Sequence, residues 1–164
     1  STSGEFTAAM GIRTANDKSM SIQLGVGATV LVCDNLAFHA DVIALARRHT
    51  SGLNLADSLD GAVERFIVKY NIMSSQFEDL QRQLIGDDRA RLMIYDIFAK
   101  GVLSPSYFPD VHAAFFEPTG AAYDAKYANT LWGLHNSFTW ALKSAPMPVQ
   151  HRVTRQLAQE FALA

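Results

Sequence analysis

Cysteine is almost absent from this sequence: Cys33 is the only one in 164 residues, so no disulfide can form within the chain. A lone cysteine argues against a disulfide-stabilised secreted domain and predicts a reducing, cytoplasmic location. No apolar run approaches the ~20 residues needed to cross a membrane. The first residues also lack the basic and apolar regions of a signal peptide. We therefore expect no membrane partner.

An excess of either charge is also missing, because the formal net charge is -2 and the isoelectric point is about 6.2. This balance excludes a uniformly basic nucleic-acid coat but is compatible with a local basic patch. Hydrophobic residues make up 49% and charged residues 18% of the chain, which suits a packed protein rather than a disordered one. The length suits a single domain, 1–164.

The first third of the chain, 1–52, carries the signals of strands. Four runs have the alternation or the β-branched composition of strands: 6–12, 22–26, 30–32 and 42–46. Residues 36–48 also suit a helix, because alanine and leucine favour one. Turn-forming residues follow the first and the third of these runs: Asn16 and Asp17 after the first, and Asp34 and Asn35 after the third. We predict an antiparallel β-meander of about four strands.

The remainder, 53–164, changes to apolar steps of three and four, which indicate amphipathic helices. A long helix starts at Leu55 and is predicted to end near Gly86. Its apolar stripe is Leu59, Val63, Phe66, Tyr70, Met73, Phe77, Leu80 and Leu84. The order of strands followed by about five helices predicts an α+β fold.

Four shorter helices are predicted after the long one. The second is capped by Asp87 or Asp88, with an inward face of Leu92, Tyr95 and Phe98. The third begins at Phe108 and Pro109. The fourth is capped by Asn129 and faces inward with Leu131, Leu134, Phe138 and Leu142. The last begins at Pro148 and has an apolar stripe of Val149, Val153, Leu157 and Phe161.

Basic residues near the turns of the predicted sheet are the candidate binding residues. Guanidinium and ammonium groups on one rim of a sheet are suited to phosphate. These residues are Arg13, Lys18, Arg47, Arg48 and His49, and the turns that present them contain Asn16, Asp17, Asp34 and Asn35. Two further basic sets, each also compatible with an ordinary solvated surface, are Arg82, Arg89 and Arg91, and His151, Arg152 and Arg155.

Other chemistry-bearing residues have weaker patterns. No histidine pair has a metal-ligand spacing, and Cys33 suits a small buried side chain better than a nucleophile. The aromatic set Trp132, Asn136 and Trp140 suits either a base-stacking platform or the core. We predict no catalytic residue, cofactor or metal, although a metal-dependent nuclease would use Asp17, Asp34 or Asp41.

Several stretches together resemble the phage- and plasmid-borne family called domain of unknown function 932. The stretches are 11–19, with Gly25, 32–36, 45–50 and 130–139. The family's Asn-Ser-His-Asp motif stands here as Thr14, Ala15, Asn16 and Asp17, so the histidine is missing. The resemblance implies a mobile-element protein. At the level of fold, the order of three strands and a helix is similar to the core of single-strand annealing proteins.

These observations favour a non-enzymatic nucleic-acid-binding protein that binds or anneals single strands as a homo-oligomer. Two alternatives remain open at this point. One is a protein-interaction or assembly module that uses the long amphipathic helix 55–85, which the net negative charge favours. The other is the metal-dependent nuclease.

Overall fold

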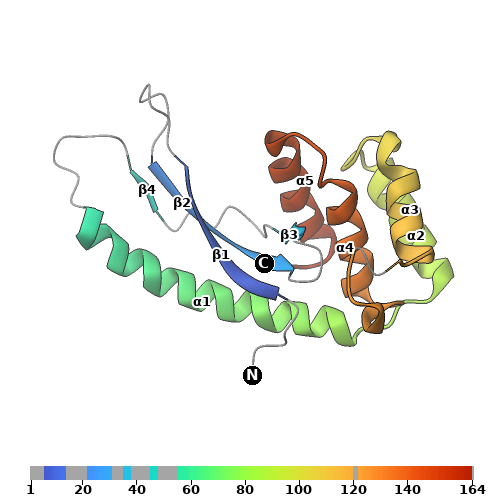
Figure 1. Cartoon of the computed structure of the whole chain (residues 1–164), viewed down its shortest axis with the longest axis horizontal. Helices are drawn as coiled ribbons and strands as arrows, with labels where there is room; N and C mark the ends of the chain where they lie inside the picture. Colours follow the sequence, from blue (N-terminus) through green and yellow to red (C-terminus); the bar gives the residue numbers. More distant parts are fainter. Residues whose placement is uncertain are drawn as a thin grey trace.

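The computed structural model describes the backbone of 6–13, 22–30, 35–37, 45–47, 55–119 and 122–163, and the side chains of most residues from 64 onward. Its longest element is helix α1, Leu55–Arg82, whose 28 residues confirm the predicted long helix. The predicted stripe faces the core at Met73, Phe77 and Leu80, which are all buried. The sheet lies along α1, and the other helices gather at the C-terminal end of α1 (Figure 1).

The sheet is built on strand β2, Ile22–Val30, which pairs antiparallel with β1, Phe6–Arg13, along the whole of β1. Two short strands, β3 (Asn35–Ala37) and β4 (Leu45–Arg47), also pair antiparallel with β2. Strand β3 pairs with the end of β2 and β4 with its beginning. Within the described strands, β3 and β4 do not pair with each other.

The predicted α+β fold with a four-stranded meander is therefore wrong. In a meander β4 would pair with β3, whereas here β4 pairs with β2. If β3 continued in its own register, Ile43 would stand opposite Ile22, but Arg47 stands there, four residues later. Strands β3 and β4 thus follow each other along one edge of β2. Moreover, 64–119 and 122–163 contain helices and no strand. The buried side chains that the structure describes therefore form a core between helices. The helical character of this part agrees with the prediction.

Four helices follow α1: α2 (Asp87–Ala99), α3 (Phe108–Phe116), α4 (Leu131–Ala141) and α5 (Met147–Glu160). Short 3-10 turns, Pro105–Tyr107 and Ala125–Tyr127, precede α3 and α4. Helix α3 begins at Phe108 with a proline in its first turn, as predicted. In α5 the predicted stripe is buried at Val153 and Leu157, and Phe161 is buried just beyond the helix.

Helix α4 is the centre of this bundle, because nine of its 11 residues are buried. Ring contacts join it to three neighbouring elements. Trp132 lies 4.8 Å from Phe77 of α1, measured between ring centroids, and Phe138 lies 6.1 Å from Phe98 of α2. His135 meets Phe161, just past α5, edge-on at 5.1 Å. A helix enclosed on several sides is expected to be apolar all round, and α4 departs from this at its polar residues.

The buried polar side chains of α4 bond to the helix's own backbone. Ser137 Oγ donates to the Gly133 carbonyl at 2.8 Å, and Asn136 Nδ2 donates to the Trp132 carbonyl at 2.9 Å. Thr139 Oγ1 donates to the Asn136 carbonyl at 3.1 Å. Because each bond lies within one helical turn, the backbone of α4 itself accepts a hydrogen bond from each of these buried donors. Asn136 Oδ1 is buried and has no hydrogen-bond partner among the described residues.

The N-terminus of α4 is capped by Thr130, not by the predicted Asn129. Thr130 Oγ1 accepts a hydrogen bond from the Gly133 amide at 3.1 Å and donates one to the Tyr127 carbonyl at 2.6 Å. Asn129 has a positive φ of 60°, a conformation that asparagine tolerates better than most residues. Its carbonyl accepts from the Ile85 amide at 2.8 Å, which ties this turn to the segment between α1 and α2.

Helix α2 buries a different face from the one predicted. Ala90, Ile94 and Ile97 point into the core, whereas Leu92 and Tyr95 are 68% and 71% exposed. Gly86, not Asp87 or Asp88, is the N-cap residue. Past the C-terminus, Gly101 adopts a φ of 71°, the left-handed conformation in which glycine commonly ends a helix.

Gly133 allows the closest approach in the bundle. A β-carbon at this position would lie 2.7 Å from the Tyr127 carbonyl oxygen and 3.1 Å from the Tyr123 ring. We expect Gly133→Ala to lower the free energy of unfolding by about 1–3 kcal/mol, because it overpacks a buried backbone contact. Gly86→Ser is the control, since nothing lies within 4 Å there and serine is a good N-cap residue. Equal urea midpoints for the two variants would contradict this interpretation.

Tyr123 should make the fold sensitive to high pH. Burial raises the pKa of its phenol above the usual 10.0, although a hydrogen bond with Ser137 opposes the shift. A raised folded-state pKa means that this contribution to stability is complete below pH ~10 and is lost as the pH rises through the folded value. We expect Tyr123→Phe to flatten the fall of the urea midpoint between about pH 9 and 11. An unchanged slope in Tyr123→Phe would exclude Tyr123 as the cause.

Candidate functional site

Two of the predicted phosphate-binding residues lie at one end of the sheet. Strands β1 and β4 both run antiparallel to β2, so both end beside its first residues. Arg13 is the last residue of β1 and pairs with Gln23; Arg47 is the last residue of β4 and pairs with Ile22. Because β2 lies between them, two strand spacings, ~10 Å, separate the backbones of the two arginines. This closeness is a product of strand pairing, since 33 residues lie between them in the sequence.

The register also assigns the two arginines to different cross-strand rows. Arg13, Gln23 and Ala46 form one row, whereas Arg47 shares the next row with Ile22. Adjacent rows belong to opposite faces of a sheet. The two residues therefore share an end of the sheet but not a face, and a ligand that meets both has to pass over that end.

The other residues predicted for this site are mostly outside the described part of the chain. Lys18, Asn16 and Asp17 belong to the connection between β1 and β2, and Arg48 and His49 follow Arg47 directly in the sequence. Asp34 is outside as well. Asn35 begins β3 opposite Val30, at the other end of β2 from Arg47.

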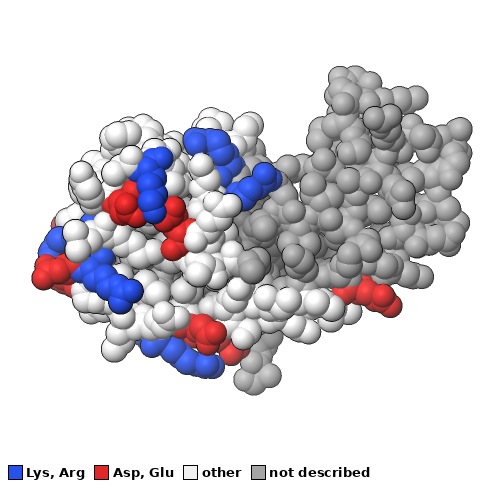
Figure 2. All heavy atoms as spheres, turned by 180° about the vertical axis from the view of Figure 1, so that it is seen from behind, with Lys and Arg blue, Asp and Glu red and all other residues white. Residues whose placement is uncertain are grey.

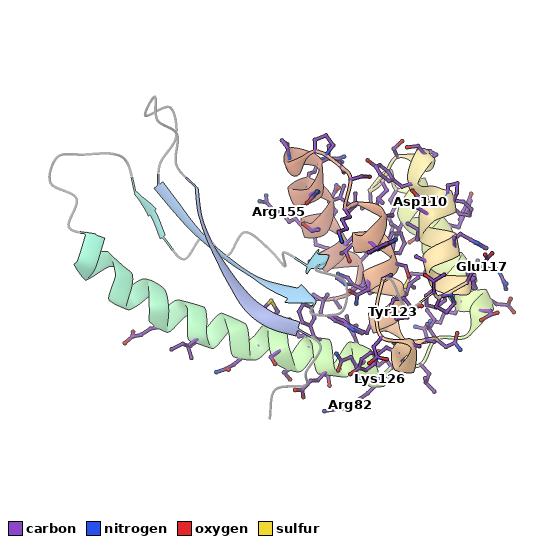
Figure 3. All side chains as sticks on the ribbon, in the orientation of Figure 1. Arg82, Asp110, Glu117, Tyr123, Lys126 and Arg155 are labelled. Carbon is purple, nitrogen blue, oxygen red and sulfur yellow. The ribbon has the colours of Figure 1, made fainter. Side chains whose placement is uncertain are left out.

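The two further basic sets do not form a patch. Arg82 pairs with Glu78 at 3.3 Å, and Arg91 pairs with Asp88 at 3.4 Å and covers the Phe116 ring at 4.8 Å. Acidic and basic side chains alternate over the helical part (Figure 2). Arg82 and Arg155 lie on different sides of it (Figure 3). The described helical surface is therefore of mixed charge, and the side chain of His151 is outside the described set.

The aromatic residues of α4 do not form a stacking platform. Trp132 and Asn136 are both completely buried, so neither can meet a base. Trp140 is half-buried, with the Lys143 ammonium 5.0 Å from the centre of its ring. Since the two tryptophans present no common exposed surface, the interpretation of Trp132 and Asn136 as core is the correct one.

The predicted apolar stripe of α1 packs into the core at the helical positions whose side chains the structure describes. Met73, Phe77 and Leu80 are buried, and the large apolar residues exposed on α1 lie outside the stripe: Ile67, Val68 and Ile72. Leu84, the last residue of the stripe, is 79% exposed just past the helix. A partner that docks on Met73, Phe77 and Leu80 would have to displace the bundle.

A cavity of about 460 Å³ lies between α3 and the end of α4, and the sequence analysis missed it. Its α3 side consists of Asp110, Ala113, Ala114 and Glu117, which recur at helical spacing on one face. Trp140, Lys143 and Ser144 line the other side. Asp110 lies near the start of α3 and Glu117 at its end (Figure 3). Small alanines between two acids were the available sequence signal, but that pattern is also common on solvated helices.

The described part of the chain shows neither a metal site nor a membrane-spanning helix. Among the described side chains, no three His, Cys, Asp or Glu residues are grouped so that they could hold a metal ion. Asp17, Asp34, Asp41 and Cys33 are outside that set. No helix within the described ranges has the length and apolar character needed to cross a membrane.

Comparisons of the chain with protein-family models, with curated proteins and with solved structures gave no match. The resemblance found in the sequence therefore stays a prediction. Function has to be argued from the residues of the chain itself.

Proposed function

We propose that this protein binds nucleic acid, with a preference for single strands, at the end of the sheet where β1 and β4 finish. The observation that supports this proposal is the pairing of both strands with the start of β2, which brings Arg13 and Arg47 to a common end. Basic residues that lie close together in a fold can neutralise neighbouring phosphates of a nucleic acid.

The charge distribution supports this end of the sheet over the helices. Several basic side chains in the described helical part are engaged by acids, such as Lys100 by Asp96 at 2.7 Å and Lys126 by Asp124 at 3.3 Å. Phosphates would have to compete with these carboxylates. By contrast, further basic residues lie close to Arg13 and Arg47 in the sequence: Lys18, Arg48 and His49.

Geometry limits how a strand would bind. The backbones of the two arginines lie ~10 Å apart, so they would contact phosphates that are only a few nucleotides apart on one strand. Because the arginines occupy rows of opposite faces, the strand passes over the end of the sheet and not across one face. The preference for single strands rests on the resemblance of the N-terminal third, and a cytoplasmic location is supported by the lone Cys33.

The test is a pair of alanine substitutions read by fluorescence anisotropy. Labelled single- and double-stranded oligonucleotides are titrated without magnesium at several salt concentrations. We expect Arg13→Ala/Arg47→Ala to weaken single-strand binding by about tenfold or more and to reduce the slope of log K against log salt by about 1.4, because each lost phosphate contact removes ~0.7.

Arg152→Ala is the control, because it removes an exposed positive charge that lies on α5 and not at the end of the sheet. We expect its affinity and salt slope to stay near wild type. If the double variant binds as the wild type does, or if Arg152→Ala loses as much per charge, the proposed end of the sheet is not the binding surface. Failure of the wild type to bind even at low salt would exclude nucleic acid as a direct ligand.

A further inference from the structure

The outer face of α2 presents large apolar side chains to solvent. Leu92 and Tyr95 are the large members of this face, and Asp88 and Ala99, both exposed, continue it at helical spacing in both directions. The opposite face of α2 is buried at Ala90, Ile94 and Ile97. Helix α2 therefore has two apolar faces, and the described chain covers only one of them.

We propose that a second copy of this chain docks on this outer face, with the two α2 helices antiparallel across a two-fold axis. An axis between Leu92 and Tyr95 sets each Leu92 against Tyr95 of the second copy. The same axis sets Asp88 against Ala99 at both ends of the contact. A two-fold contact must be self-complementary. This face meets that condition, because each pair of opposed positions contains at least one apolar side chain and no acid lies opposite another acid.

The charges beside the outer face complement each other under the same operation. Arg89 and Asp96 are seven residues apart, close to two helical turns, so they lie on the same flank of α2. In an antiparallel pair each flank meets the equivalent flank of the partner helix, which brings Arg89 of one copy to Asp96 of the other, twice. Arg89 is exposed, and no ion pair within the described residues involves it.

Asp96 can accept this second partner. Its Oδ2 atom already lies 2.7 Å from the Lys100 ammonium of its own chain. A carboxylate has two oxygens and about four acceptor positions, so one lysine does not saturate it. The cluster of Arg89, Asp96 and Lys100 also includes Glu160, which lies 2.8 Å from Lys100, so two acids balance two bases.

The parallel alternative is less favourable on the same surface. It would stack each residue of the outer face on its own copy, so the fully exposed Asp88 carboxylates would meet each other. It would also align the two helix dipoles in the same direction. The antiparallel arrangement separates the two Asp88 side chains by the length of the contact.

The size of the contact sets the expected affinity. One helix of 13 residues from each chain buries less than the roughly 1,600 Å² of a standard stable interface. We therefore expect a weak and reversible association. Its location on α2 is separate from the end of the sheet at Arg13 and Arg47, so the assembly needs no nucleic acid (Figure 1).

Sedimentation velocity across the micromolar range, without nucleic acid, measures this association. We expect the wild type to shift from monomer to dimer with concentration, and Leu92→Asp to remain a monomer with the wild-type circular dichroism spectrum. Val68→Asp is the control, because Val68 is a similarly exposed apolar residue on α1. A wild type that is monomeric throughout, or a Leu92→Asp variant that dimerises like the wild type, would overturn the proposal.

Charge reversal tests the antiparallel register. Arg89→Glu alone sets two carboxylates against each other in both symmetric pairs, and Asp96→Arg alone sets two guanidinium groups against each other. Each variant alone should therefore lose dimers, although Lys100 keeps Glu160 as a partner in the second variant. Mixed in equal amounts, the two variants regain one acid and one base in each pair and should form heterodimers. A mixture that stays monomeric rejects this register.

Discussion

The burial of α4 is the constraint on which the helical part depends. A helix that packs against α1 and α3 and meets rings of α2 and of the end of α5 has no solvated side for its polar residues. Buried polar groups without partners cost free energy, and α4 avoids much of this cost by bonding Ser137, Asn136 and Thr139 to its own carbonyls. Thr130 and Gly133 also favour this burial, because they allow the turn before α4 to pack tightly against the helix.

The inward faces of α1 and α5 were predicted correctly at the residues whose side chains are described. Along α1 and α5 the apolar residues repeat on one face, so their period identifies both the helix and its inward side. Helix α2 has apolar residues on two sides, and the period alone does not decide between them. The sequence pattern favoured Leu92 and Tyr95, whereas packing buries Ile94 and Ile97.

The arrangement of the sheet depends on contacts that local patterns do not encode. Alternation and turn residues marked where strands could form, but the pairing of β4 with β2 is a long-range choice. That choice decides which basic residues become neighbours. Arg13 and Arg47 could be selected by type from the sequence, while their shared end and different rows follow only from the register. The cavity beside Trp140 was missed because it depends on how α3 and α4 meet.

The two arginines are held by strand ladders of unequal length. Strand β1, which carries Arg13, pairs with β2 over eight residues, whereas β4, which carries Arg47, pairs over three. Local opening costs least where few pairs have to break. Strand β4 can therefore detach from β2 while the long β1–β2 ladder stays closed, which would withdraw Arg47 and leave Arg13 in place. The two halves of this sheet end thus differ in local stability, because the ladder that holds Arg47 is the shorter one.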